Sequence, residues 1–154
     1  MKFVNNYQGK RAEKEDVSAP YKKVSDYMAR KLITLNPSQS MHEATGILLK
    51  NNISGAPVVN DKNELMGVIS EGNCLKQISE SRYHNQPLTE GLVEQYMTKE
   101  VVTIDCNTDI FDAASQFLKS RIRRFPVLDD GKLVGQISQK DIMQAVLDLK
   151  SQTW

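Results

Sequence analysis

Residues 67–73 read GVISEGN and residues 135–141 read GQISQKD, so the chain writes the pattern Gly-x-Ile-Ser-x-x-(Asn or Asp) twice. Each copy lies where an apolar run ends and a helical pattern begins. When the two phrases are superimposed, other residues come into register at a spacing of 69: Met28 with Met97, Thr34 with Thr103, Ala44 with Ala113, and Pro57 with Pro126. A repeat of this length predicts two copies of one structural unit.

The spacing falls by one residue, to 68, between Gly67 and Gly135. The lost residue lies in a predicted hairpin turn, which reads DKNE at 61–64 and the tighter DGK at 130–132. Turns accept changes of length at little cost. A duplication with one deletion in a turn therefore explains the register.

Hydrophobic periodicity predicts the same order of elements in each copy: strand, helix, strand, strand, helix. The short apolar runs LITL (32–35) and VVTI (101–104) are typical of strands. A helix with an apolar stripe follows each of them, and SMHE at 40–43 is a capping box for the first helix. Two hairpins are then predicted from paired apolar runs: APVV with LMGVIS, and FPVL with LVGQIS.

A second helix closes each copy. Its apolar positions are Leu75 and Ile78 in the first copy, and Ile142, Val146 and Leu149 in the second. A short helical segment precedes each copy, reading VSDYM at 24–28 and VEQYM at 93–97. The predicted fold class is α/β (α+β), with helices covering a sheet layer.

The domain boundaries follow from composition. We assign residues 24–80 to the first repeat, the polar segment 81–91 to a linker, and residues 92–150 to the second repeat. Residues 1–23 carry six Lys or Arg against three Asp or Glu and have almost no periodicity. We expect them to form a flexible or partner-dependent arm.

Charge and cysteine content exclude several classes of function. Twenty basic and 19 acidic residues give a formal charge of +1, which offers no argument for nucleic acid or membrane as a partner. The chain has no apolar stretch near the roughly 20 residues that span a bilayer, so we expect a cytoplasmic protein. Cys74 and Cys106 stand alone, which predicts reduced thiols and no metal site. Cys74 is expected to be a buried hydrophobe, and His42 and His84 to lie on the surface.

The repeated phrases resemble the CBS (cystathionine β-synthase) domain family, in the tandem arrangement called a Bateman module. The resemblance covers about residues 24–148 and rests on VSDYM and VEQYM, Thr34 and Thr103, SGAPVV and RRFPVL, and GVISEGN and GQISQKD. It implies two repeats around a pseudo-two-fold axis, with two crevices for adenosine compounds such as AMP, ADP, ATP or S-adenosylmethionine. A stand-alone, bacterial-type protein of this family is the expected identity, without a required cofactor.

Ser138 and Asp141 stand at a strand-to-helix junction, where they are typical of a helix N-terminal cap. The same geometry offers a hydroxyl and a carboxylate to a ribose diol. The resemblance favours this ribose-binding role. Ser70 and Asn73 hold the matching positions in the first copy, where Asn offers one neutral acceptor in place of a carboxylate.

Arg123 and Arg124 precede the strand that begins at Phe125, in a basic run that is usually a solvated surface. Their spacing from Pro126 resembles a family phrase whose side chains reach nucleotide phosphates, and guanidinium groups match phosphate oxygens well. The first copy has Ser54 and Gly55 in these places. The arginines can reach across a shared crevice, so the crevice that they serve is left open.

Adenine requires a flat apolar slot with backbone groups at its edge. Most of the candidates for such a slot are also expected in the core. They are Thr34, Ile53, Ala56, Pro57, Thr103, Ile122, Phe125 and Pro126, with Ile33, Val68, Val102 and Gln136 beside them.

The resemblance implies a non-catalytic regulatory module that binds an adenosine compound and signals to an unknown target protein. A structural module that only dimerises, with empty crevices, is the alternative. An enzyme requires an acid/base pair or an activated nucleophile, which the sequence does not supply. We also expect a homodimer, because one repeat pair leaves helix faces with Tyr27, Met28, Met97, Met143 and Leu147 little covered by their own chain.

Overall fold

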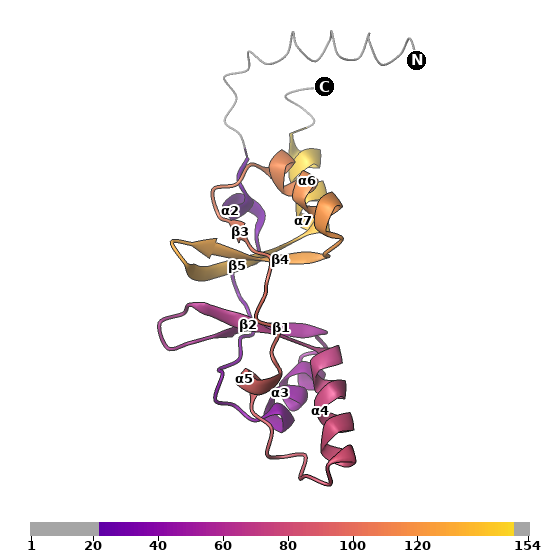
Figure 1. The fold of residues 1–154 in the computed structure, drawn as a ribbon. Helices are drawn as coiled ribbons and strands as arrows, with labels where there is room; N and C mark the ends of the chain where they lie inside the picture. The colour runs from indigo at the N-terminus through magenta and orange to yellow at the C-terminus, as the bar shows by residue number, and fades with distance from the viewer. Residues whose placement is uncertain (1–21, 150–154) are drawn as a thin grey trace, which may run out of the picture.

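The computed structural model describes residues 22–149, so the expected N-terminal arm falls outside the described residues except for Lys22 and Lys23. Figure 1 shows two halves stacked so that their sheets face each other and their helices lie outside. One half contains α3 (Met41–Lys50), β1 (Gly55–Val59), β2 (Leu65–Ser70), α4 (Glu71–Tyr83) and α5 (Val93–Tyr96). The other contains α2 (Val24–Tyr27), β3 (Ile104–Asp105), α6 (Ile110–Ser120), β4 (Arg124–Asp129), β5 (Lys132–Ser138) and α7 (Gln139–Asp148).

Both predicted hairpins are present. Strand β1 pairs with β2 antiparallel, and β4 pairs with β5 in the same way, so that Pro57 lies opposite Val68 and Pro126 opposite Gln136. The tighter turn has positive φ at Asp130 (50°) and Gly131 (78°), as a two-residue hairpin connection requires. The two turns also meet, because Asn63 Nδ2 donates a 2.7 Å hydrogen bond to the carbonyl of Leu133.

The prediction for the first strand of each copy was wrong in extent. In the second copy the strand has only two residues, Ile104 and Asp105, which run parallel to β4. In the first copy it is reduced to one bridge, between Leu35 and Val58. The chain crosses from one half to the other just before these residues, because Ala29 pairs with Gln136 in the opposite sheet. A segment that leaves one sheet for another has no room for a longer ladder.

This crossing exchanges the short leading helices between the halves. Val24 and Met28 of the α2 segment belong to the core that contains Ile104, Phe125 and Ile137 of the second copy. In the same way, Val93 belongs to the core of the first copy and Met97 packs against it. The helix that precedes each repeat in sequence therefore packs on the other repeat in space, and neither half is complete without it.

The exchange explains the glycine of the repeated phrase. A Cβ atom at Gly135 would lie 2.6 Å from Met28 Sδ and 2.7 Å from the carbonyl oxygen of Ala29. At Gly67, a Cβ atom would lie 2.7 Å from the carbonyl oxygen of Thr98. Only glycine lets the leading segment of the other repeat approach the strand so closely.

Two expectations about surfaces need correction. Met28 is buried, and Met97 and Tyr27 are partly buried, because the exchanged helices are covered by the opposite half. Leu75 and Ile78 of α4 point outward instead of inward, with 66% and 42% of their surface exposed. The inner face of α4 is formed by the buried residues Cys74, Gln77 and Ser81.

Hydrogen bonds make this polar inner face possible. Gln77 Nε2 donates to Ser81 Oγ and to the carbonyl of Leu88, each at 3.0 Å. These bonds tie the helix to the residues that follow it. The free, buried state predicted for Cys74 is confirmed, and Cys106 is also free and buried.

Candidate functional site

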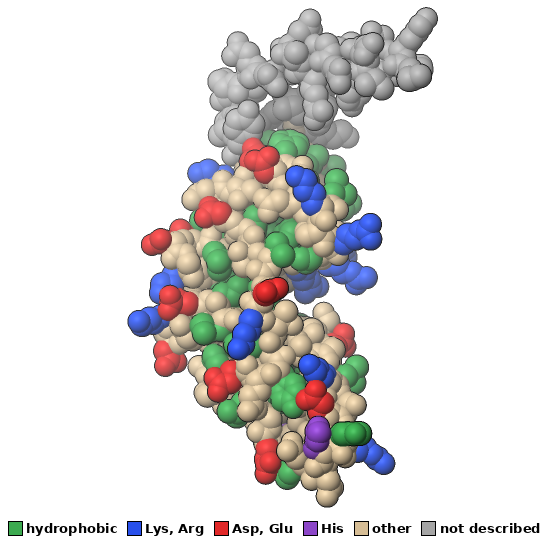
Figure 2. Space-filling model, viewed as in Figure 1, with side chains coloured by type: hydrophobic (Ala, Val, Ile, Leu, Met, Phe, Trp, Pro, Cys, Tyr) green, Lys and Arg blue, Asp and Glu red, His purple; other side chains and the backbone are tan. Residues whose placement is uncertain are grey.

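A cavity of about 320 Å³ lies between the two halves, and we call it the first crevice. Figure 2 shows the molecule notched at the level where the sheets of Figure 1 face each other, with Lys and Arg side chains beside the notch. The volume is within the range of small-molecule sites. The crevice is lined by Ser54, Gly55, Ala56, Pro57, Val68, Ser70, Asn73, Thr98, Glu100, Val101, Val102, Ile122, Arg124, Pro126 and Gln136.

Apolar residues from both copies form much of this lining. Ala56, Pro57 and Val68 come from the first hairpin, whereas Ile122 and Pro126 come from the second copy. Pro57 and Pro126 hold equivalent positions in the two repeats, so both copies contribute the same strand position to one crevice. This arrangement can accept a flat apolar ring such as a nucleobase.

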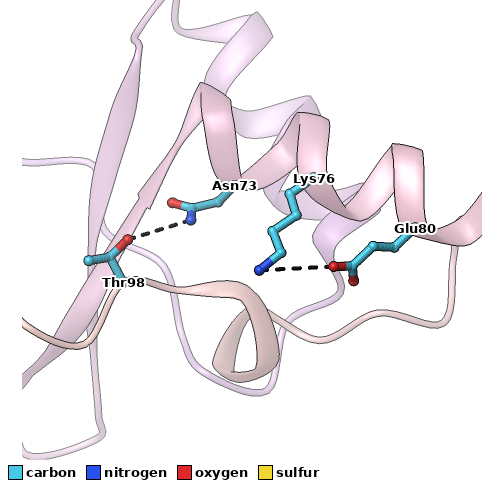
Figure 3. A network of polar contacts seen from close by, with 4 residues as sticks. All are labelled: Asn73, Lys76, Glu80 and Thr98. Carbon is cyan, nitrogen blue, oxygen red and sulfur yellow. Dashed lines mark hydrogen bonds and ion pairs between the residues drawn. The ribbon is translucent and has the colours of Figure 1, made fainter.

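A polar end of the first crevice is built at the N-terminus of α4. The backbone N–H of Ser70 donates a 2.8 Å bond to Asn73 Oδ1, and Ser70 Oγ donates a 2.9 Å bond to the same oxygen. Asn73 Nδ2 donates a long, 3.5 Å bond to Thr98 Oγ1, which Figure 3 shows. Both lone pairs of the Asn73 oxygen are therefore occupied.

The second copy repeats the cap but leaves a free acceptor. Asp141 Oδ2 accepts a 2.8 Å bond from the N–H of Ser138, and Ser138 Oγ accepts a 3.2 Å bond from the N–H of Asp141. The other carboxylate oxygen of Asp141 has no hydrogen-bond partner among residues 22–149. Neither residue lines the first crevice. They occupy the place in the second copy that Ser70 and Asn73 occupy in the first.

The structure separates the two candidate arginines. Arg124 lines the first crevice, whereas Arg123 does not. The carbonyl of Arg123 instead accepts a 3.4 Å bond from the N–H of Gln139, at the start of α7. The carbonyl of Ser54 accepts an equivalent bond from Glu71, at the start of α4. Arg123 thus stands beside the cap of Ser138 and Asp141, as Ser54 stands beside the cap of the first copy.

Four adenine-slot candidates lie away from the first crevice. Phe125 is fully buried in the second core, 4.5 Å from Phe117 between ring centroids. Strand alternation explains this, because its neighbours Arg124 and Pro126 line the crevice. Ile53 packs against the first core, Thr34 is exposed and Thr103 is half-buried, and none of these three lines the crevice.

Thr98, Glu100 and Val101 line the crevice and were missed by the sequence reasoning. They follow the exchanged helix α5 and pair with the first sheet, where the N–H of Val68 donates a 3.0 Å bond to the carbonyl of Thr98. The available signal was the register of the repeat, which matches them with residues 29–32. Periodicity alone does not show that a connecting segment crosses to the other half.

A second, mainly polar hollow of about 390 Å³ lies at the far side of α4, away from the crevice. Its Tyr96 has a pKa raised by burial and by a hydrogen bond to Glu80. Glu80 also lies 3.9 Å from Lys76, an exposed contact that is drawn in Figure 3. The hollow is lined by Lys76, Glu80, Ser81, Gln86, Pro87, Glu90, Gly91, Gln95 and Tyr96.

Comparison with solved structures gives the same architecture. A crystal structure of CBSX2 in complex with AMP matches with a TM-score of 0.71 and 31% identity, covering 85% of this chain and 99% of that one; CBSX2 is from Arabidopsis thaliana. The CBS domain pair of MJ0100, in complex with 5′-methylthioadenosine and S-adenosyl-L-methionine, matches with a TM-score of 0.66 and 27% identity. That match covers 84% of this chain and 98% of the other.

Curated relatives are often longer than this chain, which spans between 25% and 74% of the lengths of the first eight. The 25% case is an L-aspartate semialdehyde sulfurtransferase of Methanocaldococcus jannaschii, 29% identical over 86% of this chain. Among residues 22–149, no helix is both long and apolar enough to cross a membrane. The CBS domain model matches residues 24–80 and 93–148, and with both copies of the repeat accounted for, the chain belongs to the CBS domain family.

Proposed function

We propose that this protein is a regulatory module that binds adenosine compounds between its CBS repeats and passes their presence to a partner protein. The observation that carries the proposal is the first crevice, where one cavity joins an apolar slot, a capped helix N-terminus and the Arg124 side chain. These features match the three parts of an adenosine compound: the base, the ribose and an anionic group carried on the 5′ carbon. The AMP complex of CBSX2 and the adenosine-ligand complex of MJ0100 support the same class of ligand.

In this proposal, ribose hydroxyls are recognised at the two caps. Ser138 and Asp141 keep a free carboxylate oxygen, and Ser70 can redirect its hydroxyl from Asn73 to a ligand. Ala56, Pro57, Ile122 and Pro126 flank the base in the first crevice. Adenine nucleotide acts as a regulatory ligand, and no additional cofactor is needed.

We also propose that binding is not followed by chemistry. Cys106 is buried, and burial together with the charges of Asp129 and Asp105 raises its pKa, which keeps the thiol protonated and weakly nucleophilic. His42 and His84 are exposed, and neither lines the first crevice. The sulfurtransferase relative is four times as long as the part that this chain matches, so its activity does not transfer with the CBS pair.

The competing function is a structural one, in which the pair forms a homodimer and the crevices stay empty. The exposed apolar side chains of α4 and α7 favour an assembly surface. Dimerisation and ligand binding are compatible, so oligomeric state alone does not decide between the two functions. Ligand binding does.

A thermal-shift series tests the proposal. Adenosine, AMP, ADP, ATP, 5′-methylthioadenosine and S-adenosylmethionine are added in turn, and a ligand that binds the folded state raises Tm in a concentration-dependent way. Val102→Trp should abolish the shift from the first crevice, because Val102 is half exposed and lines it. The matched control is Leu118→Trp, on the exposed side of α6.

Two results would contradict the proposal. The absence of any shift with all six compounds would favour the structural module. Conversion of ATP in the presence of Mg²⁺ at a rate that follows the purified protein would indicate an enzyme. If the shift survives Val102→Trp, the bound compound lies elsewhere.

A further inference from the structure

The internal duplication gives the residues of the first crevice equivalents by the register of the repeat, and we call the site of these equivalents, around Ser138 and Asp141, the second crevice. The N–H and carbonyl of Thr98 both pair with Val68, and those of Ala29 both pair with Gln136, at 2.8–3.0 Å. The segments 98–102 and 29–33 therefore run along the two sheets in the same way. Because the backbones are equivalent, any difference in charge between matching side chains is a difference in what each crevice can bind.

The first crevice contains opposite charges. Glu100 comes from the connecting segment and Arg124 from the start of β4, and both line the cavity. Neither forms an ion pair, since the one pair within residues 22–149 joins Lys76 to Glu80. Asn73 adds no charge at the capped helix. A carboxylate and a guanidinium are thus both available to a ligand.

The matching positions of the second crevice have another charge pattern. By the register of the repeat, Lys31 takes the place of Glu100, Arg123 the place of Ser54, and Asp141 the place of Asn73. These positions carry two cations and one carboxylate, which already serves the helix cap. This pattern suits a phosphate group, whereas the pattern of the first crevice does not, because Glu100 repels phosphate oxygens.

We infer that Glu100 makes the first crevice selective for adenosine compounds with a zwitterionic 5′ substituent, carrying an ammonium and a carboxylate, over 5′-phosphates. The guanidinium of Arg124 pairs with the carboxylate of such a ligand, in a geometry that allows two parallel hydrogen bonds. The carboxylate of Glu100 pairs with the ammonium. The inference rests on the proposed function, since it names the ligand class of one crevice.

Titration calorimetry on Glu100→Lys tests this inference, because the variant places at 100 the residue found at the equivalent position, Lys31. The probes are S-adenosylhomocysteine, whose 5′ substituent carries an ammonium and a carboxylate and no other charge, AMP, and 5′-methylthioadenosine, whose 5′ substituent is uncharged. Reversal of an exposed charge should weaken S-adenosylhomocysteine about tenfold and strengthen AMP by a similar factor. The affinity for 5′-methylthioadenosine should stay the same.

Two variants complete the design. Glu100→Gln should give a smaller change of about threefold in the same directions. Glu94→Lys is the matched control, because it makes the same charge change at an exposed position of α5 that does not line the crevice. Its three affinities should equal those of the wild type, and each binding phase is assigned to the first crevice by its loss in Val102→Trp.

The outcomes separate the inference from the proposed function. If none of the three probes binds, the proposed function fails and the inference fails with it. If 5′-methylthioadenosine binds in the phase lost with Val102→Trp, but Glu100→Lys leaves the ratio of the other two affinities unchanged, only the inference is overturned. Equal effects of Glu100→Lys and Glu94→Lys on the three affinities would also overturn the inference, because equal effects would indicate a change in the overall electrostatic field of the protein and no local contact with Glu100.

Discussion

Ser70 and Ser138 cap their helices in the same way, yet the residues three positions later have different free atoms. The side-chain oxygen of Asn73 accepts two hydrogen bonds and its amide nitrogen donates one, whereas only one of the two carboxylate oxygens of Asp141 accepts a hydrogen bond. Capping and ligand recognition are therefore compatible at Asp141, because different atoms perform them. At Asn73 they compete, since a ligand has to replace a bond that already exists.

The glycines of the repeated phrase are expected to be intolerant of any side chain. Gly135→Ala places a methyl group 2.6 Å from Met28 Sδ and 2.7 Å from a backbone oxygen, which we expect to lower the free energy of unfolding by about 1–3 kcal/mol. Gly46→Ala is the control, because nothing lies within 4 Å of its Cβ position in helix α3. It should stabilise the protein by about 0.5–1 kcal/mol. Urea unfolding measures both, and equal effects would contradict the explanation.

The bond between Tyr27 and Asp148 predicts a pH dependence in two directions. The Tyr27 hydroxyl donates to Asp148 Oδ2 at 2.7 Å. This bond lowers the pKa of Asp148, with a contribution from Gln144, and raises the pKa of Tyr27 together with partial burial. The stabilisation that comes from Asp148 is present above the pKa that this carboxyl has in the unfolded chain, and it is lost as pH falls through its pKa in the folded protein. The stabilisation that comes from Tyr27 is present below the pKa that this hydroxyl has in the unfolded chain, and it is lost as pH rises through its pKa in the folded protein.

Tyr27→Phe should therefore destabilise the protein at neutral pH, and the difference from wild type should shrink at both acidic and strongly alkaline pH. Urea unfolding across the pH range measures this difference. Tyr83→Phe is the control, because Tyr83 is 85% exposed and forms no hydrogen bond with a carboxylate among the described residues. A difference that is constant with pH would show that the ring, and not the hydroxyl, is responsible.

At the scale of elements, the sequence pattern predicted those helices and strands that depend on residues close together in the sequence. Both hairpins and the helices α3, α6 and α7 are present, and Ile142 of α7 and Leu149 just after it are buried as expected. The first strands and the inner face of α4 could not be predicted, because each depends on a partner that is distant in sequence. Leu35 forms a bridge with Val58 of β1, after the chain has crossed from the opposite sheet, and Gln77 is buried with Leu88 as an acceptor of its hydrogen bond.

In the candidate site too, the features set by local sequence could be predicted and those set by distant partners could not. The cap residues follow from the repeated phrase, and both caps are formed. Which of Arg123 and Arg124 lines the first crevice depends on the alternation of side chains along β4 and on the exchange of the leading segments. Glu100 had no signal of its own in the sequence, since an exposed glutamate is ordinary until the other half of the crevice is placed opposite it.

The exchange of leading helices predicts that a substitution in a leading helix destabilises the repeat that is distant from it in sequence. Met28→Ala should destabilise the protein by about 2–4 kcal/mol, because Met28 is buried and its loss leaves a cavity. Hydrogen exchange should then lose protection in β5, whose Gly135 touches Met28, before it does so in β1 or β2. Met97→Ala should do the reverse and loosen β2, with a smaller effect because Met97 is only partly buried. Loss confined to the repeat in which each methionine is encoded would contradict the exchange.

At the scale of the whole molecule, each closing helix carries exposed apolar side chains on its outward face. Leu75 and Ile78 lie on α4, and Met143 and Leu147, which are 70% and 61% exposed, lie on α7. Both helices lie toward the right-hand side of Figure 1. Because each half presents one such helix, a second copy of the chain offers a matching surface, and two-fold pairing is the commonest way to bury it.

We therefore predict a homodimer that is disrupted by charge on α7. Sedimentation should show a dimer for the wild type at micromolar concentration and a monomer for Met143→Glu with Leu147→Glu. Leu49→Glu is the control, because Leu49 is 76% exposed but lies on α3, outside the proposed face. A wild type that sediments only as a monomer would rule out the assembly.

The two crevices should also bind AMP with unequal affinity, and the tighter one should be that of Ser138 and Asp141. A charge-assisted hydrogen bond contributes about 1.5–3 kcal/mol, against about 0.5–1.5 kcal/mol for a neutral one. Asp141 has a free carboxylate oxygen for a ribose hydroxyl, whereas Asn73 has neither charge nor a free lone pair. The difference is on the order of 1 kcal/mol, which corresponds to about fivefold to tenfold in Kd.

Exchange of the two residues tests this assignment by titration calorimetry with AMP. Asp141→Asn should remove the tight phase, because it converts the charged acceptor to an amide. Asn73→Asp should strengthen the weak phase, although the gain is reduced by the lost bond to Thr98 and by Glu100, which lines the same crevice. Asn73→Asp should still lower the Kd for AMP, because the added carboxylate contacts the ribose directly while Glu100 acts on the 5′ substituent. A tight phase that survives Asp141→Asn and disappears with Asn73→Ala would mean that the crevices are assigned in the wrong order.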